Sequence, residues 1–163
     1  MELYVVRHGI AFDRDPGRWP DDRDRPLTEE GEARFRRAAR GLARITGSVD
    51  IVLSSPLARA WRTAELLEDE AGWPEPIGCG ELEPERRPVE VVGALEPYRS
   101  ADAVALVGHE PLLGEVIGHL LSGGADDGAI PLKKGGAAMV SLDGDDAELR
   151  WLLTPKIERV LGK

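Results

Sequence analysis

The most informative stretch of this chain is LYVVRHG, at residues 3–9. Its first four residues are an unbroken apolar run, and the stretch ends at a glycine, which predicts a buried strand. Ligands of open α/β sheets bind in the crevice outside the carboxyl ends of the strands. Arg7 and His8 therefore lie where ligand-binding or catalytic residues are expected.

The pairing of Arg7 with His8 has two interpretations. A guanidinium disfavours a neighbouring imidazolium, so the pair suits a site where an anion lies between them and a neutral histidine acts as nucleophile. The alternative is a structural histidine that forms hydrogen bonds, with Arg7 paired to a nearby carboxylate. A tripeptide alone leaves both interpretations open, because short motifs match many unrelated chains.

Composition narrows the class of protein. A chain of 163 residues predicts a single domain spanning residues 1–163, large enough to bury roughly 70% of its unfolded surface. No apolar run approaches the length of a membrane span and no cationic, apolar leader is present, so we expect a cytoplasmic protein away from membranes. A net charge of −9 argues against nucleic-acid binding. No exposed apolar stripe stands out, so we expect a monomer.

Apolar runs alternate with amphipathic segments along the chain. Buried strands are predicted at residues 3–6, 50–54 and 103–108, a short strand at 76–82, and two strands around a turn between 137 and 153. Thr28 is expected to cap a helix that buries Ile45 and ends at Gly47. Ser55 is expected to cap a second helix, ending near Ala71, and further helices are predicted at 89–95 and from Pro111.

Strands that alternate with helices predict an α/β fold: a three-layer α/β/α sandwich with a mostly parallel central sheet and antiparallel C-terminal strands. Residues 13–26 carry alternating aspartates and arginines, with prolines and a glycine, and are predicted to be a long loop. That loop is either a lid over a site or a solvated surface loop whose charges pair with one another.

Three predicted strands are each followed by polar residues that suit phosphate. The first delivers Arg7 and His8, the second Ser55 and then Arg59, and the third His109. The carboxyl ends of parallel strands meet at one edge of a sheet, so these side chains are expected to converge. Two arginines, two histidines and helix N-termini together can bind a phosphoryl group.

The sequence lacks the motifs of other phosphate-binding and catalytic sites. No P-loop pattern is present, and Cys79 has Glu85 where a thiol phosphatase needs an arginine. One cysteine also excludes an intrachain disulfide and any multi-cysteine metal site. His109 and Glu110 lack the second histidine of a zinc helix, so neither a metal nor another cofactor is predicted. His119 is expected to be an ordinary helical residue, and Lys133 and Lys134 a solvated pair.

Four motifs together resemble the histidine phosphatase superfamily, and the short length and the second motif resemble its SixA-like phosphohistidine phosphatase branch. The motifs, in order, are Arg7-His8-Gly9, Arg25-Pro26-Leu27-Thr28 with Gly31, Ser55 to Ala60 with Thr63, and Gly108-His109. The resemblance implies a phosphoglycerate mutase-like fold, with His8 as the nucleophile that becomes phosphohistidine. It also implies that Arg7, Arg59 and His109 bind the phosphoryl oxygens and that no metal is required.

The resemblance leaves the general acid open. Asp22 stands three residues before the second motif, as a candidate aspartate does in the SixA-like branch, and is the preferred acid. Glu81 lies roughly where other branches keep a glutamate. A phosphohistidine substrate has a nitrogen leaving group that departs easily once protonated, so a strong acid is dispensable for it.

The leading hypothesis is a metal-independent phosphatase for phosphohistidine in a signalling or phosphotransfer protein. One alternative is a phosphomonoesterase for a small metabolite or nucleotide, because both activities would use the same pocket. The other is a phosphate-binding module without turnover. The short segment between Leu82 and Ala103 favours an open, shallow site that suits a phosphorylated side chain of a protein.

Overall fold

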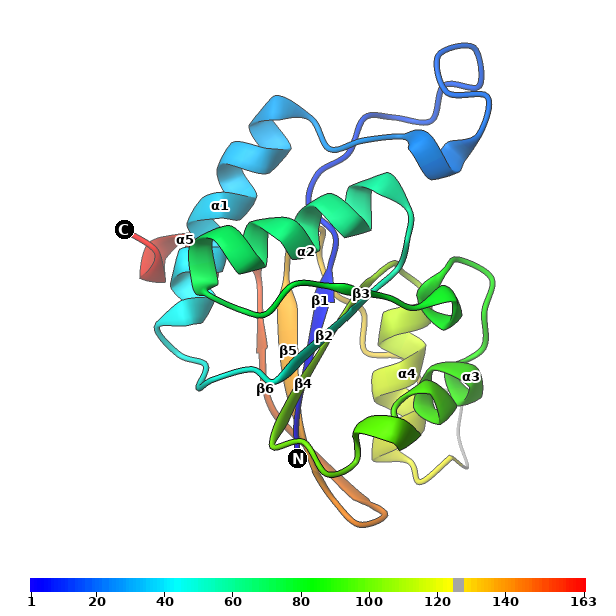
Figure 1. Ribbon diagram of the computed structural model, residues 1–163, viewed down its shortest axis with the longest axis vertical. Coiled ribbons are helices and arrows are strands. Elements are labelled where there is room, and N and C mark those ends of the chain that lie inside the picture. Colours follow the sequence, from blue (N-terminus) through cyan, green and yellow to red (C-terminus); the bar gives the residue numbers. More distant parts are fainter. Residues whose placement is uncertain (125–127) are drawn as a thin grey trace.

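The computed structural model describes residues 1–124 and 128–163, and these ranges contain one sheet of six strands in the order β3-β2-β4-β1-β5-β6 (Figure 1). The strands are β1 Glu2–Arg7, β2 Ile51–Ser54, β3 Ile77–Gly78, β4 Ala103–Gly108, β5 Ala137–Asp143 and β6 Asp146–Leu153. The strands from β3 to β1 in this order pair in parallel, whereas β5 pairs antiparallel with β1 and with β6.

This topology gathers distant segments at one edge of the sheet. Arg7 at the end of β1 pairs with Gly108 at the end of β4, and Ser54 at the end of β2 pairs with Val107. Because β5 runs the other way, it begins at this same edge, and β6 ends there. We call it the carboxyl edge, after β1, β2 and β4.

Helices cover both faces of the sheet (Figure 1). One face carries α1 Glu29–Ala43, α2 Ala58–Ala71 and α5 Pro155–Leu161, and the other carries α3 Pro88–Ala94 and α4 Leu112–Leu121. Successive side chains of a strand point to opposite faces, so the Tyr4 and Val6 side chains join the core under α1 and α2. Those of Leu3 and Val5 join the core under α3 and α4. The predicted three-layer α/β/α architecture is confirmed.

Capping residues near the helix ends account for where most helices begin and end. The Thr28 hydroxyl accepts a hydrogen bond from the Gly31 amide and so caps α1, as expected. Gly72 ends α2 in the left-handed region at φ 69°, which glycine adopts without steric cost. None of the helices in the described ranges has the length and apolar character that a membrane span requires.

Four expectations need correction. α1 ends at Ala43, and Ile45 lies in the following turn with 40% of its surface exposed. Ser55 does not cap α2: Leu57 is the N-cap residue, and the Ser55 hydroxyl bonds the Leu57 amide and His109 Nε2 instead of an amide in the first turn of α2. Only residues 77–78 of the segment 76–82 form a strand, and α5 was not predicted.

Candidate active site

His8 and His109 meet at the carboxyl edge. The His8 amide donates to the Gly108 carbonyl at 3.0 Å, which extends the pairing of β1 with β4 by one residue and holds the two histidines side by side. The centroids of their rings are 5.2 Å apart, and 7% and 3% of their surfaces are exposed. The structure thus brings together two histidines that lie about a hundred residues apart in the sequence.

A backbone hydrogen bond determines which nitrogen of His8 is available. His8 Nδ1 lies 2.7 Å from the Gly9 carbonyl oxygen, which can only accept, so Nδ1 carries the proton. Burial, and then the charges of Arg59, Arg7 and Arg25, lower the pKa of His8 to about 3 against the effect of the Gly9 hydrogen bond. The ring is therefore neutral near pH 7, and its Nε2 presents a lone pair.

His109 is held by Ser55. His109 Nε2 lies 2.8 Å from the Ser55 hydroxyl oxygen, which also accepts from the Leu57 amide at 3.4 Å. A serine hydroxyl that donates to Nε2 leaves the proton of a neutral ring on Nδ1. Burial, followed by the charges of His8 and Arg59, lowers the pKa of His109, so this ring is also neutral near pH 7.

Two arginines flank the histidines, and some of the N–H groups of these arginines donate no hydrogen bond. Arg7 Nη1 donates to the Leu132 carbonyl at 2.8 Å, and Arg59 Nη1 donates to the Asp22 carbonyl at 2.8 Å. Within the described residues, Arg7 Nε, Arg59 Nε and His109 Nδ1 are buried without a hydrogen-bond partner. Buried donors without partners are costly, and the charges of both arginines act on His8, so the cluster suits an oxyanion.

Thr63 fixes the turn that carries His8. Its hydroxyl accepts from the Gly9 amide at 3.0 Å and donates to the Arg59 carbonyl at 2.7 Å. One buried side chain of α2 therefore ties the turn after β1 to the first turn of the helix that carries Arg59. On the opposite side of the turn, the Gly135 amide donates to the His8 carbonyl at 2.9 Å.

The loop at residues 13–26 reaches the site through Asp22. An Asp22 carboxylate oxygen lies 3.1 Å from Arg59 Nη2, and the other accepts from Arg25 Nε at 2.7 Å. The hydrogen bond with Arg25 lowers the pKa of Asp22 more than burial raises it, and the charge of Arg59 lowers it further, so this carboxyl is ionised near pH 7. The loop is anchored to the site on one side and is more than a solvated surface segment.

The remaining candidates lie near the carboxyl edge but are not joined to the histidine pair. Glu81 is exposed and accepts a hydrogen bond from the Cys79 thiol, and among the described residues it forms no hydrogen bond or ion pair with the two histidines. Lys133 and Lys134 are exposed near the carboxyl edge. Sequence reasoning missed the Leu132 carbonyl that binds Arg7, because a backbone acceptor leaves no signal in the type of its side chain.

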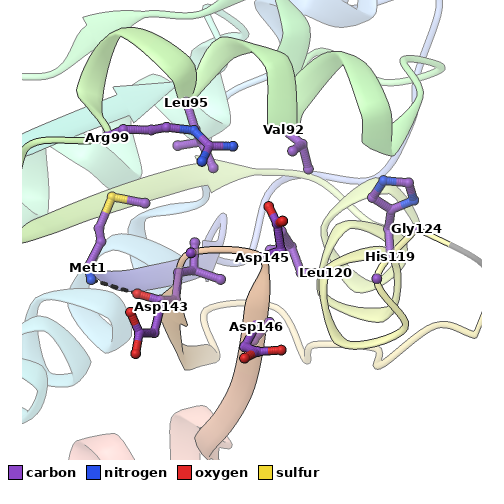
Figure 2. A pocket seen from close by; sticks show the side chains of 14 residues that line it. Met1, Val92, Leu95, Arg99, His119, Leu120, Gly124, Asp143, Asp145 and Asp146 are labelled. Carbon is purple, nitrogen blue, oxygen red and sulfur yellow. Dashed lines mark hydrogen bonds between the residues drawn. The ribbon is translucent and has the colours of Figure 1, made fainter.

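His119 lies in a different cavity, of about 680 Å³. Figure 2 shows this cavity: His119 of α4 and Arg99 lie on its helical side, and Asp143, Asp145 and Asp146 of the β5–β6 turn on the other. The Met1 ammonium donates to the Leu142 carbonyl there, at the end of the sheet opposite the carboxyl edge. This cavity is therefore separate from the histidine pair.

In the described part of the chain, no group of three or more His, Cys, Asp or Glu could hold a metal ion.

Two neutral histidines with unused arginine and imidazole donors, at the strand ends of an α/β sandwich, are the arrangement of a histidine phosphatase. The chain belongs to the histidine phosphatase superfamily (branch 1), whose family model matches residues 3–83. It is 31% identical to the phosphohistidine phosphatase SixA of Escherichia coli over 130 residues, which cover 76% of each chain.

Solved structures agree on the fold. A structure of the protein histidine phosphatase SixA complexed with tungstate has a TM-score of 0.85 and 26% identity, covering 96% of this chain and 98% of that one. The α-ribazole phosphatase of Shigella flexneri has a TM-score of 0.72 at 18% identity, covering 95% of this chain and 97% of that one, and this likeness concerns the fold alone. Phosphatase chemistry is thus supported at the level of the superfamily.

Proposed function

We propose that this protein removes the phosphoryl group from phosphohistidine in a protein, through a covalent phosphohistidine on His8. The observation that carries the proposal is the tautomer of His8. Its Nδ1 proton is committed to the Gly9 carbonyl, and the neutral ring therefore offers Nε2 as a nucleophile.

In the first step, His8 Nε2 forms a bond to phosphorus while the bond from phosphorus to the substrate nitrogen breaks. The leaving nitrogen takes up a proton and departs as neutral imidazole. In the second step, water attacks phosphorus, the bond to Nε2 breaks, and inorganic phosphate leaves. Arg7, Arg59 and His109 supply the donors that hold the phosphoryl oxygens, since phosphoryl transfer depends mainly on positioning and charge stabilisation.

Asp22 is the proposed source of the proton. Its carboxylate is ionised in the free site because Arg25 and then Arg59 stabilise the charge. A phosphoryl group that binds Arg59 competes with Asp22 for that guanidinium. Binding therefore weakens one of the contacts that lower the pKa of Asp22, so that this carboxyl takes up a proton more readily.

The choice of a protein substrate rests on the likeness to SixA, which holds in sequence and in fold. A phosphomonoesterase for a small metabolite is the second candidate. The anchored loop favours it, because Asp22 brings residues 13–26 against Arg59 and so partly encloses the site. A small substrate gains more from enclosure than a side chain on a protein surface does.

Trapping phosphate on the protein tests the mechanism. Brief incubation with a phosphohistidine protein carrying ³²P, followed by an alkaline quench, should leave an acid-labile label on the wild type. His8→Ala should take no label, and His109→Ala should keep the nucleophile but react about 10²–10³-fold more slowly. His119→Ala is the matched control, because this histidine lies at the opposite end of the sheet, and it should label normally.

Two results would change the assignment. Bound phosphate without any label on the wild type would replace the enzyme by a phosphate-binding module. Labelling from small phosphoesters but not from the phosphohistidine protein would favour the metabolite phosphatase.

A further inference from the structure

A groove lined by cations opens beside the candidate active site. It has a volume of about 380 Å³ and lies between α1, the loop at residues 132–136 and the start of α5. We call it the basic groove, and its cations are Arg34, Lys133, Lys134, Lys156 and Arg159. The residues between them give it an apolar floor, to which Ile10, Phe35, Ala38 and Pro155 contribute.

The basic groove adjoins the turn that carries the nucleophile. Gly9 and Gly135 both line it, and the Gly135 amide donates to the carbonyls of Arg7 and His8 at 3.2 and 2.9 Å. The loop at 132–136 precedes β5 and α5 follows β6, so both reach the carboxyl edge. A chain held in the groove would therefore pass the turn that carries His8.

The charges of the groove are mostly unneutralised. Lys133, Lys134, Lys156 and Arg159 form no ion pair with any described residue, and Arg34 pairs with Glu30 outside the groove lining. Arginines on other surfaces do pair: Arg36 and Arg40 both bind Glu70. In a protein with a net charge of −9, this cluster of neighbouring unpaired cations is a local positive surface that can attract an anionic partner.

The basic groove is longer than one phosphate needs. A second cavity of about 310 Å³ shares Arg34 and Arg159 with it and adds Arg37, so the cationic surface continues along α1. Glu30 also lines this extension and is the carboxylate that pairs with Arg34. A surface of this length, with cations on three elements and an apolar floor, fits an extended chain better than a compact metabolite.

We propose that the basic groove binds a carboxylate-rich segment of the protein whose phosphohistidine reacts at His8. This inference rests on the proposed function and adds the chemistry by which the substrate protein is recognised. Charge complementarity holds the segment, and the continuity of the groove with Gly9 places the phosphohistidine of that protein over the nucleophile.

Two synthetic phosphohistidine peptides of equal length test the proposal, one with glutamates and one with glutamines at the flanking positions. The enzymes are the wild type, Lys134→Glu/Lys156→Glu in the groove, and Arg150→Glu/Lys163→Glu, which makes the same change in net charge on exposed residues outside it. The wild type should prefer the glutamate peptide by about tenfold in kcat/KM at low salt, mainly through KM, and lose the preference in high salt.

The groove variant should lose this preference while its kcat/KM for the glutamine peptide stays within about threefold of the wild type. The Arg150→Glu/Lys163→Glu control should keep the preference. A wild type that treats both peptides alike, or a groove variant that retains the preference, would overturn the groove proposal and leave the proposed function standing.

Binding of the unphosphorylated glutamate peptide, followed by nuclear magnetic resonance, separates the two proposals. If neither phosphopeptide is hydrolysed, the proposed function fails, and the groove is then judged on binding alone. Peptide-induced shifts at residues 133–134 and 156–159 that vanish in the groove variant would support it. No peptide binding, or binding of inorganic diphosphate in its place, would overturn it.

Discussion

At His8, a single carbonyl oxygen determines which ring nitrogen carries the proton. The Gly9 carbonyl holds the proton on Nδ1, and burial together with three arginines keeps the ring neutral. Both effects act before substrate arrives, so no proton has to leave His8 at the moment of reaction. In the proposed mechanism, two of these arginines, Arg7 and Arg59, then stabilise the phosphoryl group by their charges.

Asp22 offers the sharpest test at the scale of a single residue. Asp22→Asn removes the proposed proton donor, so kcat for alkyl phosphoesters, whose oxygen leaving groups need a proton, should fall about 10²-fold. The loss on a phosphohistidine peptide should be below about tenfold, because protonated imidazole nitrogen leaves readily. Steady-state kinetics on both substrates measures the difference.

Asp24→Asn is the matched control, since Asp24 belongs to the same short helix at Asp22–Asp24. It makes the same change in charge and should leave both activities unchanged. Equal losses on the two substrates in Asp22→Asn would assign Asp22 to positioning Arg59 instead of to proton transfer.

Among the secondary-structure elements, α2 and the turn after β1 act as one unit through Thr63. Thr63→Val keeps the shape of the side chain but leaves the buried Gly9 amide without its acceptor. The free energy of unfolding should fall by about 1–3 kcal/mol, and kcat should fall with it because His8 is carried by the same turn. Urea unfolding and steady-state kinetics measure the two effects.

Thr46→Val provides the comparison. The Thr46 hydroxyl also donates to a helix carbonyl, that of Leu42, but at the end of α1 away from the site. It should cost less stability and leave kcat unaltered. Were Thr63→Val to lose stability without any loss of kcat, the turn would not depend on Thr63 for the placement of His8.

The helix α5 shows why one element escaped prediction. It exposes Ile157 and Val160 and buries Glu158 completely, the reverse of the pattern by which an amphipathic helix is recognised. Its position depends on close packing against α1. A Cβ atom added at Gly41 of α1 would lie 1.9 Å from the carbonyl oxygen of Glu158 in α5. Only a glycine permits that approach, and periodicity does not reveal it.

For the molecule as a whole, buried titratable groups predict opposite effects of pH on stability. Burial raises the pKa of Glu158 to about 8, against a smaller lowering by the Ala137 amide. Between about pH 4.5 and 8 the unfolded carboxyl ionises and the folded one stays protonated, so the contribution of Glu158 to the unfolding free energy should fall as pH rises. Glu158→Gln should remove this contribution, so the difference in unfolding free energy between the wild type and the variant should change by on the order of 3–5 kcal/mol from pH 5 to 8 in urea unfolding.

Glu148→Gln, on an exposed residue of β6, is the control and should leave the decline in place. His8 and His109 act in the other direction, because their lowered pKa values mean that only the unfolded chain takes up protons below about pH 6.5. In Glu158→Gln, which lacks the opposing carboxyl, stability should therefore fall as pH drops below about 6.5, and more steeply than in the wild type. A decline above pH 6.5 that persists in Glu158→Gln would contradict the assignment to Glu158.

The sequence by itself determined the parallel strands, the order of the elements and the convergence of His8, Arg59 and His109. Apolar runs identify buried strands, and parallel strands bring the residues that follow them to one edge. These signals are local, so a single sequence contains them. The role of Ser55 shows the limit: its position suggested a helix cap, and only its contact with His109 revealed what its hydroxyl does.

Only the tertiary structure decided the features that depend on distant pairs. The Leu132 carbonyl on Arg7, the close contact of α5 with α1, and the basic groove formed by three separate segments are examples. Each requires the register and packing of elements more than a hundred residues apart. The spacing of residue types within a segment does not encode such contacts, because periodicity reports only which side of an element is buried.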